Sequence, residues 1–309
     1  MASKRTMLWQ RVLNHVKPEL VIGIQPDVSL CRACRMSNIP VYDFQHGIIA
    51  SDHLWYGKKL KDVAGGDLPT GFLCWDKNSA NVLAQWAPSR GLSVCVVGNP
   101  WFQRFQYPVE KDQLVQDALV KGRIFTNNRP TILVSLQWGL HLHYYQGSDF
   151  NKVMCKALET VIKKTHDKYN WLLRLHPVQK RGAEAQYCED YLSREFGDYP
   201  TVEWHKVSRF PLPLVLNESD LHITDMSTVV IEAAWLRVPS ALLNPCLNKG
   251  GTLENLFQQE RQAGIATVLS QEAEAIESWI GGQCHYQRKV KTADPPGGRF
   301  LHWLNRAMA

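Results

Sequence analysis

The sequence of 309 residues lacks a long apolar run, an internal repeat and a low-complexity tract. A membrane-spanning helix needs about 18 consecutive apolar residues, so the first absence argues against one. The other two absences argue against a solenoid and against extended disorder. The opening stretch MASKRTMLWQRVLNHVKPEL has basic residues but no apolar segment of the kind that a secretory signal needs, so we expect a cytoplasmic protein.

The basic residues do not form a dense stripe. The net charge is +6, and the Lys and Arg residues are scattered apart from short clusters such as Lys58 with Lys59 and Lys163 with Lys164. A nucleic-acid-binding protein would show a denser basic pattern, so we expect no nucleic-acid partner. A modest positive charge is compatible with an anionic ligand and with peripheral contact to the inner face of a membrane.

The chain also lacks the residues that would complete a zinc site. Cys31 and Cys34 have C-x-x-C spacing, but no second cysteine pair or nearby histidine pair accompanies them. They lie in the helix-like run SLCRACRMSN and not at a strand-to-helix turn, which also argues against a redox role. We expect buried packing cysteines and no metal.

What the sequence does contain is a regular alternation of strand and helix signals. Ten expected strands lie at 19–24, 41–44, 71–75 and 92–97 in the first part, and at 131–139, 170–178, 202–207, 220–225, 239–245 and 265–270 in the second. Helical segments lie between them, one ending near 37 and one at about 79–86 in the first part, and others at 150–169, 183–196, 213–217, 228–236 and 253–263 in the second. They predict parallel sheets with crossover helices. We expect an α/β protein with two Rossmann-like domains, at 1–128 and 129–285, and a C-terminal segment at 286–309 that packs back on the first domain.

In the first domain, the stretch IPVYDFQHGIIASDHLWY contains an apolar run that stops at Gln45, His46 and Gly47. The run predicts a buried strand, and open α/β sheets bind ligands at the carboxyl ends of their strands. His46 is therefore a candidate general base for an acceptor hydroxyl. The alternative is that His46 and Gly47 only close a turn, and Asp43 or Asp52 would then be the base or nucleophile.

In the second domain, polar residues follow three of the expected strands. They are Gln137, Trp138 and Gly139, then Arg174, His176 and Pro177, then Asp225, Ser227 and Thr228. Parallel strands end on the same side of a sheet, so we expect these residues to converge at one cleft. Ser227 and Thr228 open a helix, and their hydroxyls with the amides of its first turn would suit an anion.

These residues also have plainer interpretations. Ser227 could be only a helix N-cap, and His176 could be a hydrogen-bonded histidine at the end of a core strand. Pro177, however, fixes the turn after His176 and would hold the imidazole at the rim of the cleft, near a phosphate or a base carbonyl. Glu232 lies one turn into an otherwise apolar helix and, if buried, needs a partner that a ribose diol would supply.

Taken together, QHG in the first half, LHP in the second and DMSTVVIEAAWLRVP near the end resemble the bacterial GT-B glycosyltransferases of surface-polysaccharide assembly. The similarity is to the capsule-synthesis group with the Kdo and sialic acid transferases, and to the CDP-glycerol glycerophosphotransferases. It implies two Rossmann-like domains that face each other across a cleft, with the acceptor on the side of the first domain and the nucleotide sugar bound by the second. The first domain shows about four strands, fewer than a complete nucleotide-binding half, which is consistent with a shortened domain.

The resemblance also implies roles for individual residues. In the sialyl- and Kdo-transferring families the His of an HP pair and the hydroxyls of a Ser-Ser or Ser-Thr pair bind the cytidine nucleotide, which implies this role for His176, Ser227 and Thr228. In the glycerophosphotransferases an HG histidine is the base, which implies that role for His46.

The activity implied by the resemblance is a metal-independent glycosyl transfer without a cofactor. The donor is a nucleotide sugar, with a CMP-linked sugar favoured over CDP- or UDP-linked ones, and the acceptor is a glycan or a lipid-linked molecule. Two alternatives are a CDP-glycerol glycerophosphotransferase and a non-catalytic module that binds a nucleotide or a glycan.

Overall fold

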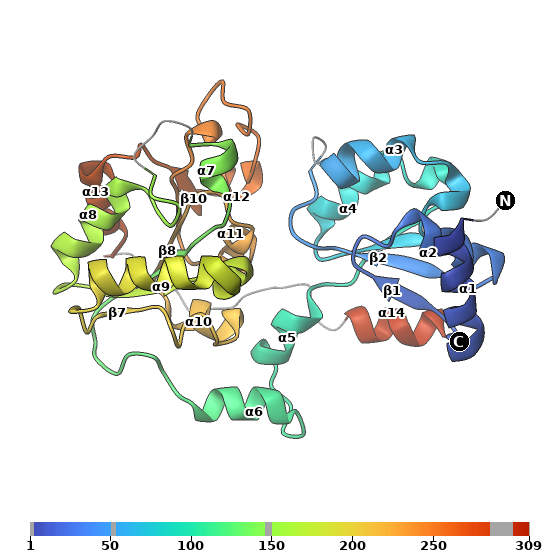
Figure 1. Ribbon diagram of the computed structural model, residues 1–309, viewed down its shortest axis with the longest axis horizontal. Helices are drawn as coiled ribbons and strands as arrows, with labels where there is room; N and C mark the ends of the chain where they lie inside the picture. Colours follow the sequence, from blue (N-terminus) through green and yellow to red (C-terminus); the bar gives the residue numbers. More distant parts are fainter. Residues whose placement is uncertain (1–2, 51–53, 146–149, 285–298, 309) are drawn as a thin grey trace. The chain divides into compact units, whose positions relative to one another are not determined.

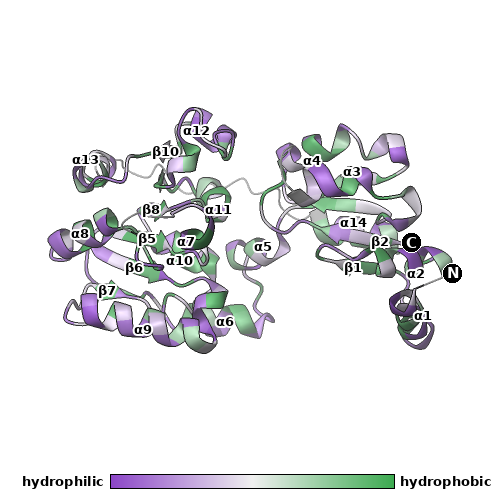
Figure 2. Cartoon of the chain, turned by 45° about the horizontal axis from the view of Figure 1, so that its top comes forward, coloured by the Kyte–Doolittle hydropathy of each residue, from purple (hydrophilic) through white to green (hydrophobic). Residues whose placement is uncertain are grey.

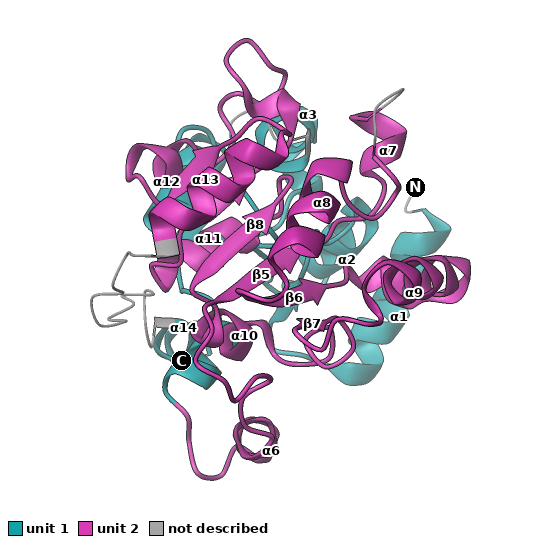
Figure 3. Ribbon diagram, turned by 90° about the vertical axis from the view of Figure 1, so that its left-hand side faces the viewer, with its two compact units in different colours: residues 1–107, 294–309 teal, residues 108–293 magenta. Residues whose placement is uncertain are grey.

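The computed structural model describes residues 3–50, 54–145, 150–284 and 299–308 (Figure 1). The chain divides into two compact units, one made of Met1–Tyr107 with Asp294–Ala309 and the other of Pro108–Ala293 (Figure 3). The first unit therefore takes its residues from both ends of the chain. Helix α6 (Gln113–Val120), which precedes the boundary expected near residue 128, belongs to the second unit.

The first unit contains one parallel sheet whose four strands follow chain order. They are β1 (Val21–Gly23), β2 (Val41–Phe44), β3 (Gly71–Cys74) and β4 (Ser93–Val96). Each lies inside a strand expected from the sequence, which confirms the four-strand pattern. Because all four run the same way, Gln45 and His46 after β2 lie at the carboxyl edge of the sheet.

Helices and helical turns precede, connect and follow these strands. They are α1 (Lys4–Val16), α2 (Val28–Met36), the π-helical turn η1 (Leu54–Lys59), α3 (Leu60–Asp62), the 3-10 turns η2 (Gly65–Asp67) and η3 (Pro88–Arg90), α4 (Lys77–Ala84) and α5 (Pro100–Gln106). The carboxylates of Asp27 and Asp76 begin α2 and α4 by accepting backbone N–H groups of Ser29 at 2.8 Å and Ser79 at 2.7 Å. Such caps satisfy amides that have no partner within the helix.

The last helix of the chain, α14 (Arg299–Ala307), packs on the sheet of the first unit (Figure 1). Trp303 contacts Tyr42 of β2 with ring centroids 4.8 Å apart, and Phe300 contacts Phe44 with centroids 6.0 Å apart. Tyr42 and Phe44 are two residues apart and thus point to the same face of the strand. An aromatic face of β2 is therefore covered by the C-terminal helix.

The second unit contains a six-stranded parallel sheet in the order β10-β9-β8-β5-β6-β7. The strands are β5 (Thr131–Ser135), β6 (Asn170–Arg174), β7 (Val202–Glu203), β8 (Leu221–Thr224), β9 (Ser240–Leu242) and β10 (Ala266–Val268). Counted from its own first strand, this is the 3-2-1-4-5-6 order of doubly wound nucleotide-binding folds. The expected six-strand alternation is confirmed.

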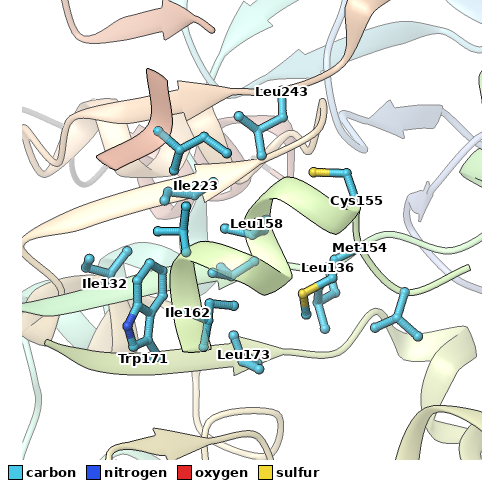
Figure 4. Close-up of a cluster of buried hydrophobic side chains, with 14 of the residues drawn as sticks. Ile132, Leu136, Met154, Cys155, Leu158, Ile162, Trp171, Leu173, Ile223 and Leu243 are labelled. Atoms are coloured by element: carbon cyan, nitrogen blue, oxygen red, sulfur yellow. The ribbon is translucent and has the colours of Figure 1, made fainter. Parts of the chain in front are cut away.

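Helices cover both faces of this sheet. They are α7 (Leu140–His143), α8 (Lys156–Thr165), α9 (Gly182–Phe196), α10 (Leu212–Glu218), α11 (Val229–Trp235), α12 (Gln258–Gln262) and α13 (Ala273–Cys284), with 3-10 turns η4 (Pro177–Lys180) and η5 (Pro245–Leu247). Strand residues such as Ile132, Trp171 and Ile223 form one core with Leu158 and Ile162 of α8 (Figure 4). The strands are mainly hydrophobic, whereas α8 and α9 carry mixed faces (Figure 2).

The opposite face of the sheet contains a buried polar group. His222 precedes Ile223 on β8 and therefore points to the face opposite that core. Its Nδ1 lies 2.9 Å from Ser240 Oγ and its Nε2 3.0 Å from Ser135 Oγ. Helices α10 and α11 contact each other and the sheet on this side. Burial lowers the pKa of His222 to about 3, so the imidazole is neutral and its role is to satisfy hydrogen bonds in the core.

Several elements differ from the sequence expectation. The helix expected at 253–263 spans only Gln258–Gln262, because Phe257 adopts the left-handed conformation with φ 55° and separates it from preceding turns. The strand expected at 202–207 stops at Glu203, whose carboxylate accepts the N–H groups of Lys206 and Val207 and closes a turn. Helices α1, α5, α6 and α7 were not expected.

Cys31 and Cys34 lie on α2, as the run SLCRACRMSN predicted. Both are buried, and burial raises their thiol pKa values to about 12 and about 11 respectively. They pack against Leu13 of α1 and Val41 of β2. Along the described part of the chain, every helix is too short or too polar to cross a membrane.

Candidate functional site

Gln137, just after β5, connects three segments at the carboxyl edge of the second sheet. Its side-chain Oε1 accepts the backbone N–H of Met226 at 2.7 Å and is 3.4 Å from Thr224 Oγ1. Its backbone carbonyl accepts a hydrogen bond from Gln179 Nε2 at 3.4 Å. The ends of β5, β6 and β8, which the sequence analysis expected to converge, are therefore hydrogen-bonded to one another.

His176 is the N-cap residue of the turn η4, after β6. Its Nδ1 accepts the N–H of Val178 at 3.2 Å, while its own backbone N–H donates to Gln179 Oε1 at 2.9 Å. Burial, with a smaller effect of Lys180, lowers the pKa of His176, which favours the neutral ring. A neutral imidazole that accepts at Nδ1 carries its proton on Nε2. Among the described residues Nε2 has no partner, so it can donate to an anion or a carbonyl.

Ser227 and Thr228 precede α11. Ser227 Oγ accepts the N–H of Val229 at 3.3 Å, which is a bond of the capping kind, although Thr228 is the residue at the N-cap position of α11. Thr228 makes no capping hydrogen bond with its side chain. A hydroxyl that accepts a backbone N–H still has its own hydrogen to donate. Both hydroxyls could therefore contribute hydrogen bonds to a phosphate.

Glu232 lies one helical turn beyond Thr228 and is half-buried. Burial raises the pKa of its carboxyl to about 7, an effect that the positive charge of Arg174 opposes. The guanidinium of Arg174 itself donates to the carbonyls of Val207 and of Phe210, the latter at 2.8 Å. Among the described residues the Glu232 carboxyl has no hydrogen bond. The partner that the sequence analysis expected it to need is thus absent from the chain described.

Asp225, at the end of β8, has a different environment. Its carboxyl is buried and accepts a hydrogen bond from the hydroxyl of Tyr145, which in turn accepts one from Gln271 Nε2 at 2.6 Å. Burial raises the pKa of Asp225 to about 6, and the bond from Tyr145 opposes the rise. The arrangement fixes the turn that carries Ser227. Sequence reasoning missed Tyr145 and Gln271, because no local pattern connects them to Asp225.

Trp138 and Gly139 form the bend between β5 and α7. The Trp138 side chain is 43% exposed, so its ring is accessible to a sugar face. Gly139 has φ 80°, a left-handed conformation that glycine adopts without strain. Pro177 likewise supplies the fixed φ with which η4 begins.

In the first unit, Gln45 fixes the turn after β2. Its buried side chain accepts the N–H of Trp75 at 2.7 Å and donates to the Gly47 carbonyl at 2.8 Å and to Ser79 Oγ at 2.9 Å. Gly47 has φ 73° and makes the bend. These bonds make Gln45 a positioning residue, and they leave the side chain of His46 exposed at the carboxyl edge of the sheet.

Asp43 lies on β2, just before this turn, and is 1% exposed. It accepts hydrogen bonds from the N–H of Gln25 at 2.9 Å, from Trp55 Nε1 at 3.4 Å and from the Tyr56 hydroxyl. Burial raises its pKa to about 7, and these bonds oppose the rise. The Tyr56 hydroxyl also bonds the backbone of His46. Asp43 thus supports the turn from within, while Asp52 lies outside the described residues.

A group of cations next to Arg174 was not singled out from the sequence. Lys180 Nζ donates to the carbonyl of Ser208 at 3.0 Å, so Lys180 and Arg174 together hold the loop between β7 and α10. Burial and the charges of Arg174, Arg181 and Arg209 lower the pKa of Lys180. The run Lys180-Arg181 shortly after LHP was the sequence signal that could have revealed this group of cations.

The described residues contain no cluster of three His, Cys, Asp or Glu side chains suited to a metal.

No protein-family model matches the sequence, and no curated protein matches it. Solved structures do match over nearly the whole chain. The UDP-GlcNAc 2-epimerase from Neisseria meningitidis, bound to UDP-GlcNAc, is 16% identical with a TM-score of 0.63, over 98% of this chain and 80% of that chain. The UDP-GlcNAc 2-epimerase from Methanocaldococcus jannaschii is 14% identical with a TM-score of 0.63, over the same shares of both chains.

The wall teichoic acid polymerase TagF, soaked with CDPG, is also similar. It is 14% identical with a TM-score of 0.60, over 94% of this chain and 72% of that chain. At such identities the likeness shows the fold, in agreement with the two parallel sheets and their strand order. The chain therefore has the GT-B type of α/β fold, built from two Rossmann-like units.

Proposed function

We propose that the protein transfers a sugar from a nucleotide-sugar donor to a glycan or lipid-linked acceptor in surface-polysaccharide synthesis, at the cytoplasmic side of the membrane. The fold and the polar carboxyl edge of the second sheet support this proposal. The sequence resemblance favours a CMP-linked donor. Two of the similar structures, however, were determined with UDP-GlcNAc or CDPG, so CDP- and UDP-linked donors must be compared with it.

The observation that carries the proposal is the carboxyl of Glu232, which has no hydrogen-bond partner in the described chain although it is half-buried. A ribose diol would donate to it. One turn earlier, Ser227 and Thr228 offer hydroxyls, and His176 offers Nε2–H to a phosphate or a base carbonyl. A nucleoside phosphate combines a diol with a phosphate, a combination that a simple sugar or an amino acid lacks.

The chemistry follows from these contacts. An acceptor hydroxyl attacks the anomeric carbon, the bond from that carbon to the phosphate oxygen breaks, and the electron pair leaves with the nucleotide phosphate. Hydrogen bonds from Ser227, Thr228 and His176 would stabilise the charge that develops on this oxygen. The acceptor proton must go to a base, and we assign that role to the exposed imidazole of His46.

A second candidate is the transfer of glycerol phosphate from CDP-glycerol. Here the acceptor oxygen attacks the phosphorus that carries the glycerol, and CMP leaves. The substrate of this reaction carries more negative charge than a CMP-linked sugar, and the cations Arg174, Lys180 and Arg181 near the candidate site favour it. The likeness to TagF concerns the fold and does not by itself decide between the two reactions.

Calorimetric titration of the whole chain with CMP, CDP and UDP separates these possibilities. Preferential binding of CMP supports a CMP-sugar donor, preferential binding of CDP supports glycerol phosphate transfer, and preferential binding of UDP supports a UDP-linked sugar. Absence of binding to all three nucleotides would refute the proposed donor site and leave only a non-catalytic glycan-binding role.

Replacing Ser227 and Thr228 together by Ala tests where the phosphate binds. Hydrogen bonds to a charged group contribute about 1.5–3 kcal/mol each, so the affinity for the preferred nucleotide should fall at least tenfold. Ser227 also caps α11, so the melting curve of the double variant is needed to separate lost binding from lost folding. Unchanged affinity would place the phosphate elsewhere.

A further inference from the structure

The second unit contains a basic pocket of about 160 Å³ that the proposed donor site does not use. It opens between the end of α6 and the loop that joins β7 to α10, and its lining residues are Ala118, Lys121, Lys206, Arg209, Phe210 and Pro211. Lys206, Arg209 and Lys121 are exposed, whereas Ala118 is buried. Three of the six lining residues are therefore cations with accessible charged groups.

The positive charge of this basic pocket is not neutralised by the described chain. The side chains of Lys121, Lys206 and Arg209 make no ion pair or hydrogen bond with any described residue. The acidic residue nearest in sequence is Glu203, and its two carboxylate oxygens already accept the backbone N–H groups of Lys206 and Val207, at 2.8–3.3 Å. It thus shapes the loop and leaves the Lys206 ammonium unpaired.

The neighbours of the basic pocket add to its positive charge. Arg174 and Lys180 bind the carbonyls of the loop that carries Arg209, at Val207, Ser208 and Phe210. These cations repel one another, because Arg174 and Arg209 both disfavour the charged form of Lys180. Holding like charges together costs free energy, which a bound anion would offset.

We propose that the basic pocket binds an anionic group, a phosphate or a carboxylate, that belongs to the acceptor glycan. The acceptor part of this statement rests on the proposed function. The volume of the basic pocket is several times the roughly 30 Å³ that one water molecule occupies in the liquid, so the basic pocket admits such a group with adjoining sugar atoms. Phe210 and Pro211 supply an apolar wall. A concave site for one group favours a glycan over a flat membrane surface.

Three hexameric probes test the proposal by calorimetry with the whole chain. They are linear hexaphosphate, hexagalacturonate and maltohexaose, which carry phosphates, carboxylates and no charge respectively. We expect one or both anionic hexamers to bind at least tenfold more tightly than maltohexaose. The stronger of the two identifies which anion the acceptor carries. Equal binding of all three, or binding of none, would overturn the proposal.

The double variant Lys206→Gln with Arg209→Gln removes two charges of the basic pocket. The matched control is Arg129→Gln with Lys168→Gln, since these exposed residues precede β5 and β6 at the opposite edge of the same sheet and their side chains make no hydrogen bond or ion pair with a described residue. Anion affinity should fall at least tenfold in the first variant and less than threefold in the control. Equal losses in both would show a general charge effect and overturn the proposal.

Two further measurements separate related explanations. Nucleotide affinity should change less than threefold in the Lys206→Gln, Arg209→Gln variant, because the donor contacts lie elsewhere. A wild-type chain that binds hexamers but no nucleotide would refute the proposed function and leave the anion site in place. Cosedimentation with vesicles of phosphatidylglycerol and phosphatidylcholine tests a membrane. Vesicle binding that the same variant abolishes, without hexamer binding, would overturn the glycan assignment.

Discussion

At the scale of single residues, the structure separates groups that contact solvent from groups that hold them in place. His46 is exposed, whereas Gln45 and Asp43 are buried and bonded on several sides. In the second unit, His176 and Glu232 retain unused hydrogen-bonding capacity, whereas Asp225 is engaged by Tyr145. The residues with unused capacity are the ones whose substitution should change chemistry more than stability.

Replacing His46 by Ala should lower the transfer rate by about 10²–10⁴, the usual contribution of a positioned base. Nucleotide affinity should stay nearly the same, because the donor contacts are assigned to the second unit. An exposed side chain contributes little to stability, so the melting temperature should also be preserved. The control is His15→Ala on α1, another exposed histidine of the first unit.

The opposite pattern would show that His46 only closes a turn. In that case the melting temperature of His46→Ala would fall while turnover per folded molecule stayed at the wild-type level. Rates must therefore be measured against the concentration of folded protein. Preserved turnover would move the role of the base to Asp52, because Asp43 is buried and fully engaged in hydrogen bonds.

Glu232→Gln should change how stability depends on pH. A carboxyl whose pKa rises to about 7 on folding stabilises the protein below the ordinary Glu pKa of about 4.3, and this contribution is lost as pH rises through 7. The wild type should thus lose stability relative to Glu232→Gln between pH 5 and pH 8, by roughly 2–3 kcal/mol. Chemical denaturation at both pH values measures this. A pH-independent difference would mean that Glu232 is ionised in both states.

At the scale of elements, α14 is held to the first unit by aromatic contacts with β2. Trp303→Ala removes a half-buried ring and should cost about 2–4 kcal/mol of stability in the first unit. Leu301→Ala is the matched control, since Leu301 is 68% exposed on the same helix and should cost much less. If both variants melt like the wild type, α14 does not stabilise the sheet.

The sequence predicts a helix or strand best where one short run of residues determines it. Strand β2 was expected at 41–44 and is found there, because an apolar run bounded by Pro40 and Gly47 determines it locally. The start of α12 was not predictable, because the left-handed conformation of Phe257 depends on surrounding turns.

The candidate site shows the same division. Gln137, His176 and Ser227 could be placed at one edge of the sheet because parallel strands end together. The contact of Tyr145 with Asp225 and Gln271, and the basic pocket formed by Lys121 with Arg209, join residues far apart in sequence. Hydrophobic periodicity contains no information about such pairs, so they appear only in the structure.

At the scale of the whole molecule, each unit has its own sheet and its own core. The second unit is continuous in sequence, so a chain of residues 108–293 should fold alone and bind the preferred nucleotide within about threefold of the full-length affinity. Circular dichroism and calorimetry check the two parts of this prediction. A folded fragment without nucleotide affinity would show that the first unit contributes donor contacts.

The first unit, by contrast, is built from both ends of the chain, and this has a consequence for biosynthesis. Tyr42 and Phe44 are made early, but their aromatic partners on α14 leave the ribosome only after the entire second unit. At about 5–20 residues per second, the interval is on the order of tens of seconds. Throughout that time the aromatic face of β2 in the nascent chain lacks the cover of α14, and exposed apolar surface of this kind is prone to aggregation.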